Sequence, residues 1–179
     1  MTQLSREFGE GLYSLCREEN IVPDVLEQLG VLSQCLRSQP DFARLLGNMS
    51  LPKAERLDIL DHALRGQVHP FLLNYMKLLC ERGILGEFDD SIKTYRALYY
   101  QDAGIIEAVA TTGVKLNEEQ RESLMKKLRA MTGHQVVLKE KVDPAVMGGV
   151  MLEMNGKRYD NTVKHRLESI RQAMDQANV

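Results

Sequence analysis

The residues that come nearest to a metal site by type and spacing are Asp58, Asp61 and His62. Spacings of three and four positions place such side chains on one side of a helix. Carboxylates and imidazoles are common ligands of divalent metals. A metal site between helices also needs ligands from a facing helix, such as a Glu-x-x-His pair, and the sequence contains no such pair. We therefore interpret these three residues as a solvated polar face, and a metal protein built on them stays an alternative.

A phosphate-binding loop is the second chemistry to consider, because Gly149–Lys157 holds two glycines and a lysine. Six residues separate the glycines where a P-loop has four, and Arg158 stands where Ser or Thr is required. The sequence has no G-x-S-x-G nucleophile motif, and its three cysteines form no C-x-x-C pair. We expect a non-catalytic protein without a cofactor.

Composition excludes further classes of protein. The chain has 179 residues, 44% hydrophobic and 27% charged, which is typical of a globular protein of one or two domains. A net charge of −2 argues against nucleic-acid binding, which needs a basic face. No apolar stretch approaches the ~20 residues of a membrane helix, so we expect no direct membrane insertion.

The first hundred residues carry helical periodicity, which predicts six short helices. Gly9 and Gly11 lie within the first helix, where each costs about 1 kcal/mol relative to Ala unless another helix approaches closely. The fifth helix is apolar over a wide arc, which indicates a central position or a bound partner. The apolar stripes are Leu4, Phe8, Leu12 and Leu15; Val25, Leu29, Leu32 and Leu36; Phe42, Leu45 and Leu46; Leu57, Leu60 and Leu64; Phe71, Leu72, Tyr75, Met76, Leu78 and Leu79; and Phe88, Ile92, Tyr95 and Tyr99.

After Gly104 the pattern alternates as strands do. We predict strands at 106–112, 136–142 and 150–154, and a helix that begins with an Asn117/Gln120 capping box. Asn155-Gly156 is a strong hairpin signal leading into 157–159, and Asp160 is the expected cap of a final helix. The predicted fold class is α+β: an N-terminal six-helix bundle (1–104) followed by a small C-terminal α/β domain (105–179) with a β-hairpin and a terminal helix.

A basic cluster lies near the C-terminus. It consists of Lys157, Arg158, Lys164, His165 and Arg166. Such a cluster is either a solvated helix face or a contact for an acidic protein partner, and the sequence leaves both readings open.

Several motifs resemble those of one protein family. They are Val142-Asp143-Pro144, Met147-Gly148-Gly149 and Asp160-Asn161-Thr162-Val163 with Leu167, together with the stretch Thr112–Gln120. In this order they resemble the delta subunit of bacterial F-type ATP synthase, the family of the mitochondrial oligomycin-sensitivity-conferring protein. The resemblance covers essentially the whole chain. Gly9 and Gly11 stand where that family usually has alanines.

The resemblance implies a non-catalytic peripheral-stalk (stator) subunit at the cytoplasmic face of the cell membrane, one copy per complex. Its N-terminal domain would grip the amphipathic N-terminal helix of an alpha subunit in a groove between the first and fifth helices. Its C-terminal domain would meet the C-terminal end of the b subunit. The partner-binding residues that we expect in the groove are Phe8, Gly11, Leu12, Leu72, Tyr75, Met76 and Leu79. The alternative is an unrelated helical-bundle adaptor of another complex.

Overall fold

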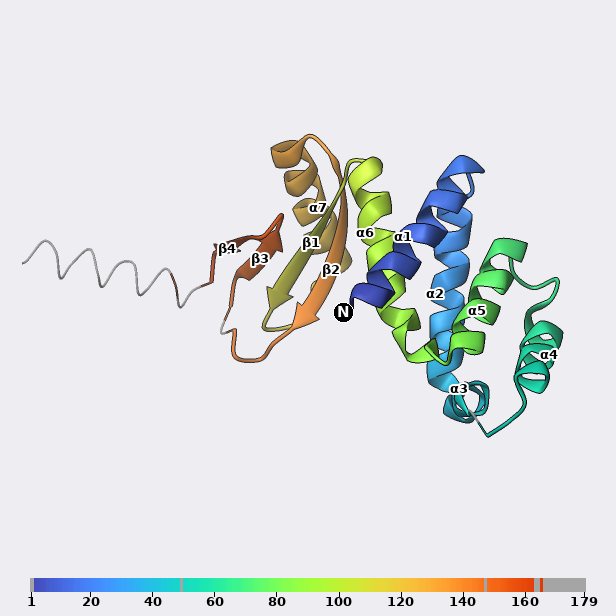
Figure 1. Cartoon of the computed structure of the whole chain (residues 1–179). Helices are drawn as coiled ribbons and strands as arrows, with labels where there is room; N and C mark the ends of the chain where they lie inside the picture. The colour runs from blue at the N-terminus through green and yellow to red at the C-terminus, as the bar shows by residue number, and fades with distance from the viewer. Residues whose placement is uncertain (1, 49, 147, 163–164, 166–179) are drawn as a thin grey trace, which may run out of the picture. The chain divides into compact units, whose positions relative to one another are not determined.

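The computed structural model describes residues 2–48, 50–146, 148–162 and 165. The chain divides into two compact units, residues 1–99 and 100–179, and the boundary falls in the last turn of a helix. The elements are α1 (Gln3–Glu18), α2 (Val22–Ser38), α3 (Pro40–Gly47), α4 (Lys53–Leu64), α5 (Pro70–Arg82), the short 3₁₀ helix η1 (Leu85–Glu87), α6 (Phe88–Asp102), β1 (Ile105–Thr112), α7 (Glu118–Thr132), β2 (Gln135–Val142), β3 (Val150–Met154) and β4 (Lys157–Asp160) (Figure 1). The predicted α+β class is confirmed.

The helices α1 to α6 of the N-terminal unit share one hydrophobic core. Its fully buried members come from all six of these helices and include Cys16, Val25, Leu46, Leu60, Leu72, Leu79 and Tyr95. Tyr95 is fully buried, and its hydroxyl donates a hydrogen bond of 3.1 Å to the Val22 carbonyl and so joins α6 to α2. A buried phenol needs such a partner, because an unpaired hydroxyl would lose its water without compensation.

The two glycines of α1 have different surroundings. A Cβ atom at Gly9 would lie 2.6 Å from the Ser91 carbonyl oxygen and 2.8 Å from Thr94 Cβ, so α1 and α6 touch at this point. The close approach of another helix that would offset the cost of a helical glycine is thus present at Gly9. Gly11 has open space around its Cβ position, so no other helix approaches it closely.

A buried arginine joins three helices at their ends. Arg56 of α4 is 4% exposed, and its Nη1 donates to the Leu46 carbonyl of α3 (3.2 Å) and to the Cys80 carbonyl of α5 (2.9 Å). Both carbonyls lie in the last turn of their helices, where the helix dipole is negative. The helix ends thus supply the negative potential that a buried guanidinium requires.

The C-terminal unit is a four-stranded sheet with the order β2-β1-β3-β4 (Figure 1). β1 and β2 are parallel and connected through α7, whereas β3 pairs antiparallel with both β1 and β4. α7 packs through Leu124 and Leu128 against Ala108, Val136 and Met154. The predicted strands, the Asn117/Gln120 capping box and the Asn155-Gly156 hairpin are all confirmed.

The Gly-Gly and Asp-Asn-Thr motifs meet in space. Gly149 has φ +85°, and a Cβ there would lie 2.4 Å from the Asn161 carbonyl oxygen. Asp160 Oδ1 accepts from the Thr162 amide, and Thr162 Oγ1 accepts from the His165 amide three residues on. The expectation that Asp160 caps a final helix stays a prediction. The predicted final helix itself lies outside the described residues.

Candidate partner-binding groove

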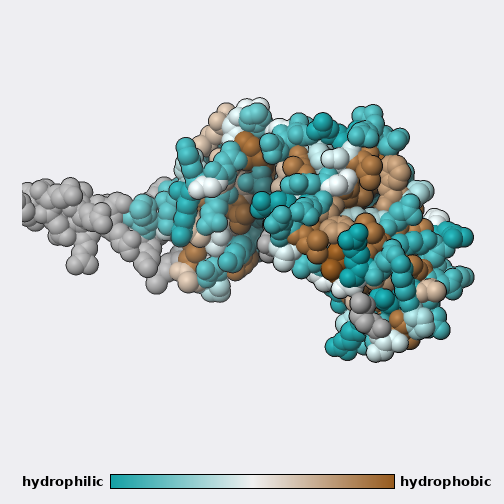
Figure 2. All heavy atoms as spheres, in the orientation of Figure 1, coloured by the Kyte–Doolittle hydropathy of each residue, from teal (hydrophilic) through white to brown (hydrophobic). Residues whose placement is uncertain are grey.

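An apolar groove runs between α1 and α5. The two helices are antiparallel, because Thr2 at the start of α1 donates a 2.6 Å hydrogen bond to Glu87 in η1, just after α5. The groove has a volume of about 860 Å³ and is lined by Leu4, Glu7, Phe8, Gly11, Leu12, Ser14 and Leu15 from α1 and by Phe71, Asn74, Tyr75, Leu78 and Arg82 from α5. Hydrophobic residues reach the surface of this unit among hydrophilic ones (Figure 2).

Exposed leucines form the walls of the groove. Leu4 is 37% exposed, Leu15 is 51% exposed and Leu78 is 37% exposed. Single exposed apolar side chains are common on protein surfaces, but several that gather on one concave surface mark a site of interaction. Gly11 lies between Leu4 and Leu15 on the α1 wall, and its missing side chain keeps the groove open.

The floor of the groove is aromatic and carries no charge. The rings of Phe8 and Tyr75 meet edge to face with centroids 6.4 Å apart. The Tyr75 hydroxyl donates a 2.5 Å hydrogen bond to Ser91 Oγ, which in turn donates to the Phe88 carbonyl. Burial raises the pKa of Tyr75 to about 12, although the bond to Ser91 acts in the opposite direction. The Tyr75 hydroxyl thus points into the unit towards Ser91, and the residue forms part of the groove lining.

The structure brings four of the seven expected partner-binding residues to this groove: Phe8, Gly11, Leu12 and Tyr75. Leu72, Met76 and Leu79 lie in the core beneath it, with exposed fractions of 0%, 1% and 0%. Their places on the α5 wall are taken by Phe71, Asn74, Leu78 and Arg82. Leu4, Leu15, Phe71 and Leu78 were all part of predicted helix stripes, but α5 carries two apolar stripes and periodicity alone did not show which one faces outward.

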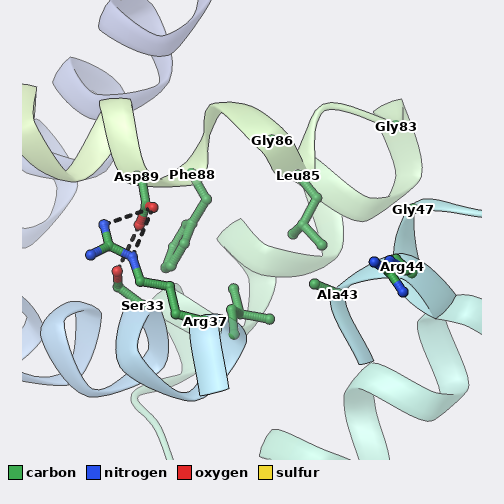
Figure 3. Close-up of a pocket in the computed structure, with 11 residues that line it drawn as sticks. Ser33, Arg37, Ala43, Arg44, Gly47, Gly83, Leu85, Gly86, Phe88 and Asp89 are labelled. Carbon is green, nitrogen blue, oxygen red and sulfur yellow. Dashed lines mark hydrogen bonds and ion pairs between the residues drawn. The ribbon is translucent and has the colours of Figure 1, made fainter. Parts of the chain in front are cut away.

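A second, smaller hollow of about 380 Å³ lies over α2, α3 and the start of α6 (Figure 3). In it Asp89 accepts hydrogen bonds from Ser33 Oγ at 2.6 Å and from Arg37 Nη2 at 2.9 Å. Burial acts to raise the pKa of Asp89, but the bonds from Ser33 and Arg37 outweigh burial and hold it below its ordinary value. The cluster ties α2 to α6, and its charges are satisfied within the unit.

Asp58, Asp61 and His62 do not converge as metal ligands. Asp61 forms ion pairs with Lys77 of α5 and with Arg65. His62 Nδ1 lies 2.9 Å from the Asp58 carbonyl oxygen of the preceding turn. Within residues 2–48, 50–146, 148–162 and 165, no group of three His, Cys, Asp or Glu side chains could hold a metal ion.

The remaining sequence candidates have structural roles or are only partly described. Gly149–Lys157 forms β3 and its hairpin turn, as the apolar alternation indicated. Lys157 and Arg158 of the basic cluster are exposed on the edge strand β4, while Lys164 and Arg166 lie outside the described residues. No helix in the described part of the chain has the length and apolar character needed to span a bilayer.

An open apolar groove between two helices is the geometry of the helix-in-groove class of binding proteins. Comparison with known proteins gives a narrower assignment. A family model described as ATP synthase delta (OSCP) subunit matches residues 4–174, and the chain belongs to this family. It is a peripheral-stalk component of the F-type ATP synthase, and members of this family are structural and not catalytic. The alternative of an unrelated adaptor is excluded.

Individual relatives agree with this family. ATP synthase subunit delta of Lacticaseibacillus casei (strain BL23) is 30% identical over 168 residues, which cover 93% of this chain and 92% of that protein. ATP synthase subunit delta of Alkaliphilus metalliredigens (strain QYMF) is 29% identical over 167 residues, 93% of each chain. A chain of the Toxoplasma gondii mitochondrial ATP synthase hexamer has a similar fold, with a TM-score of 0.75 at 15% identity over 97% of this chain and 98% of that one.

Proposed function

We propose that the groove between α1 and α5 binds the amphipathic N-terminal helix of the ATP synthase alpha subunit, and that residues 105–179 bind the C-terminal end of subunit b. One copy of the chain would then hold the catalytic head to the stalk against rotor torque, at the cytoplasmic face of the cell membrane. The observation that carries this proposal is the open apolar groove in a member of the delta family.

The energetics of the groove support a helix as its guest. Full burial of a leucine is worth about 1.5–3 kcal/mol. Leu4, Leu15 and Leu78 are each partly exposed, so covering them yields a few kcal/mol in total. The hydrogen bond from Tyr75 to Ser91 holds the floor in place before binding, which reduces the entropy lost on association.

A second contact through the C-terminal unit strengthens the first. The exposed Lys157 and Arg158 on β4 offer positive charge to an acidic segment of subunit b. When two contacts are carried on one chain, each raises the effective concentration for the other. Two contacts of moderate affinity can therefore keep the chain bound to both partners while the rotor exerts torque.

The groove can be tested at Gly11, where a side chain would enter open space. Gly11→Leu should leave the fold intact and weaken the binding of an alpha-subunit N-terminal peptide at least tenfold in a calorimetric titration. Gly30→Leu is the matched control, because Gly30 is also a helical glycine with open space at its Cβ position, but on α2. Equal affinity for the two variants would refute the groove as the alpha site.

The stator role has its own test. Removal of the chain from membranes should leave ATP hydrolysis active but disconnected from proton pumping, and adding it back should restore coupling. A pull-down with the full chain should recover alpha and b subunits. Coupling that survives removal would contradict the stator role.

A further inference from the structure

The charged side chains that line the groove lie at one end of it. Glu7 on α1 and Arg82 on α5 are the lining residues that carry charge at neutral pH. Because α1 and α5 are antiparallel, the start of α1 and the end of α5 form the same end of the groove. The opposite end, near Leu15 and Phe71, carries only the neutral polar residues Ser14 and Asn74.

Both charges are available to a guest. Arg82 is exposed and takes part in none of the ion pairs found among the described residues of its unit, where neighbouring Glu81 pairs with Lys53 instead. Glu7 accepts a 2.9 Å hydrogen bond from the neutral Gln3 amide, which leaves its negative charge uncompensated. A guest helix would thus meet a negative charge on the α1 wall and a positive charge on the α5 wall.

The length of the two groove walls also determines how long a segment of a guest helix the groove can hold. Leu4 to Leu15 and Phe71 to Arg82 each span eleven positions, which at 1.5 Å per residue is about 17 Å, or three helical turns. A helix of this length presents one apolar stripe to the floor and two flanks to the walls.

We infer that the groove selects a three-turn amphipathic helix with one acidic side chain facing Arg82 and one basic side chain facing Glu7, both at the same end of the bound segment. The charge pair fixes the direction of the guest, because a reversed helix would place its charges beside Ser14 and Asn74. This inference rests on the proposed function of the groove and names the feature of the guest that the groove recognises.

Charge reversal in the full chain provides the test, with an alpha-subunit N-terminal peptide as the probe. Arg82→Glu and Glu7→Lys should each weaken binding about five- to tenfold at low ionic strength, and the loss should shrink at 0.5 M salt. Arg44→Glu is the control, because Arg44 is exposed and lies outside the groove. One acidic-to-lysine substitution in the peptide should restore binding to Arg82→Glu.

A Leu78→Asp variant separates this inference from the proposal on which it rests. If Leu78→Asp abolishes binding while Arg82→Glu and Glu7→Lys bind as the unaltered chain does, the charge selection is wrong and the groove assignment stands. If neither Leu78→Asp nor the charge reversals change the affinity, or if the unaltered chain does not bind the peptide, both are wrong.

Discussion

Gly9 of α1 and Ser91 of α6 meet backbone to backbone, so that a Cβ atom at position 9 would lie 2.6 Å from the Ser91 carbonyl oxygen. We predict that Gly9→Ala lowers the free energy of unfolding by about 1–3 kcal/mol, because the helices must separate. The gain in helix propensity, about 1 kcal/mol, is too small to offset this.

The matched variant is Gly11→Ala on the same helix, where the Cβ position is open. This change should raise the free energy of unfolding by up to about 1 kcal/mol through helix propensity alone. Urea denaturation followed by circular dichroism measures both variants. Effects of the same sign and size would show that the close contact at Gly9 is wrong.

Arg56 provides a test of the buried guanidinium. Arg56→Ala removes its bonds to the Leu46 and Cys80 carbonyls and leaves a cavity among α3, α4 and α5, so it should cost about 2–4 kcal/mol in chemical denaturation. Arg44→Ala is the control, since that side chain is 80% exposed and should cost less than about 0.5 kcal/mol. A loss at Arg56 no larger than at Arg44 would contradict this role.

Asp89 should contribute to the pH dependence of stability. Burial is outweighed by hydrogen bonds from Ser33 and Arg37, which hold the pKa of Asp89 below its ordinary value of 3.8. A lowered folded-state pKa stabilises the protein above the unfolded-state value, and the stabilisation is lost as the pH falls through the folded-state pKa. Asp89→Asn should therefore cost up to about 1 kcal/mol at pH 7.

The cost of Asp89→Asn should begin to shrink as the pH drops below about 4, where the carboxyl of the unfolded chain takes up a proton. It should be lost once the pH has fallen through the lower pKa of Asp89 in the folded protein. Urea titrations at pH 7 and at pH 3 measure this difference. Asp41→Asn is the control, as Asp41 forms an exposed ion pair with Arg44 and should cost less at pH 7. A cost at Asp89 that stays constant from pH 7 to pH 3 would rule out the ionic contribution.

Gly149 and Gly156 form a matched pair in the C-terminal unit. Both have positive φ, +85° and +71°, but only Gly149 lacks room for a side chain, because its Cβ would meet the Asn161 carbonyl oxygen at 2.4 Å. Asn tolerates positive φ better than most residues. Gly149→Asn should thus destabilise this unit by about 2 kcal/mol more than Gly156→Asn, measured by hydrogen exchange of the β1 and β3 amides. Equal protection in both variants would contradict the close contact.

Local signals predicted the secondary structure well. The Asn155-Gly156 hairpin and the Asn117/Gln120 box rest on interactions within a few residues, so sequence alone is enough to find them. The Asp160 side chain accepts a hydrogen bond from the Thr162 amide two residues on, a local turn that is typical of aspartate.

The groove could be predicted only in part. The first and fifth helices were expected to form it, and Phe8, Gly11, Leu12 and Tyr75 line it. Leu72, Met76 and Leu79 face the core instead. The α5 sequence is apolar over so wide an arc that its periodicity does not show which side of the helix faces the core. That orientation depends on the helices against which α5 packs.

The sequence by itself determined the α+β class, the strands of the C-terminal unit and the motifs of the delta family, because these depend on local propensity and on residue order. Only the tertiary structure decided that Gly9 is a helix contact while Gly11 opens a groove, that the α5 stripe with Leu78 faces outward, and that Glu7 and Arg82 share one end. Each of these is a relation between segments far apart in the chain, and such relations arise when distant helices and strands pack together.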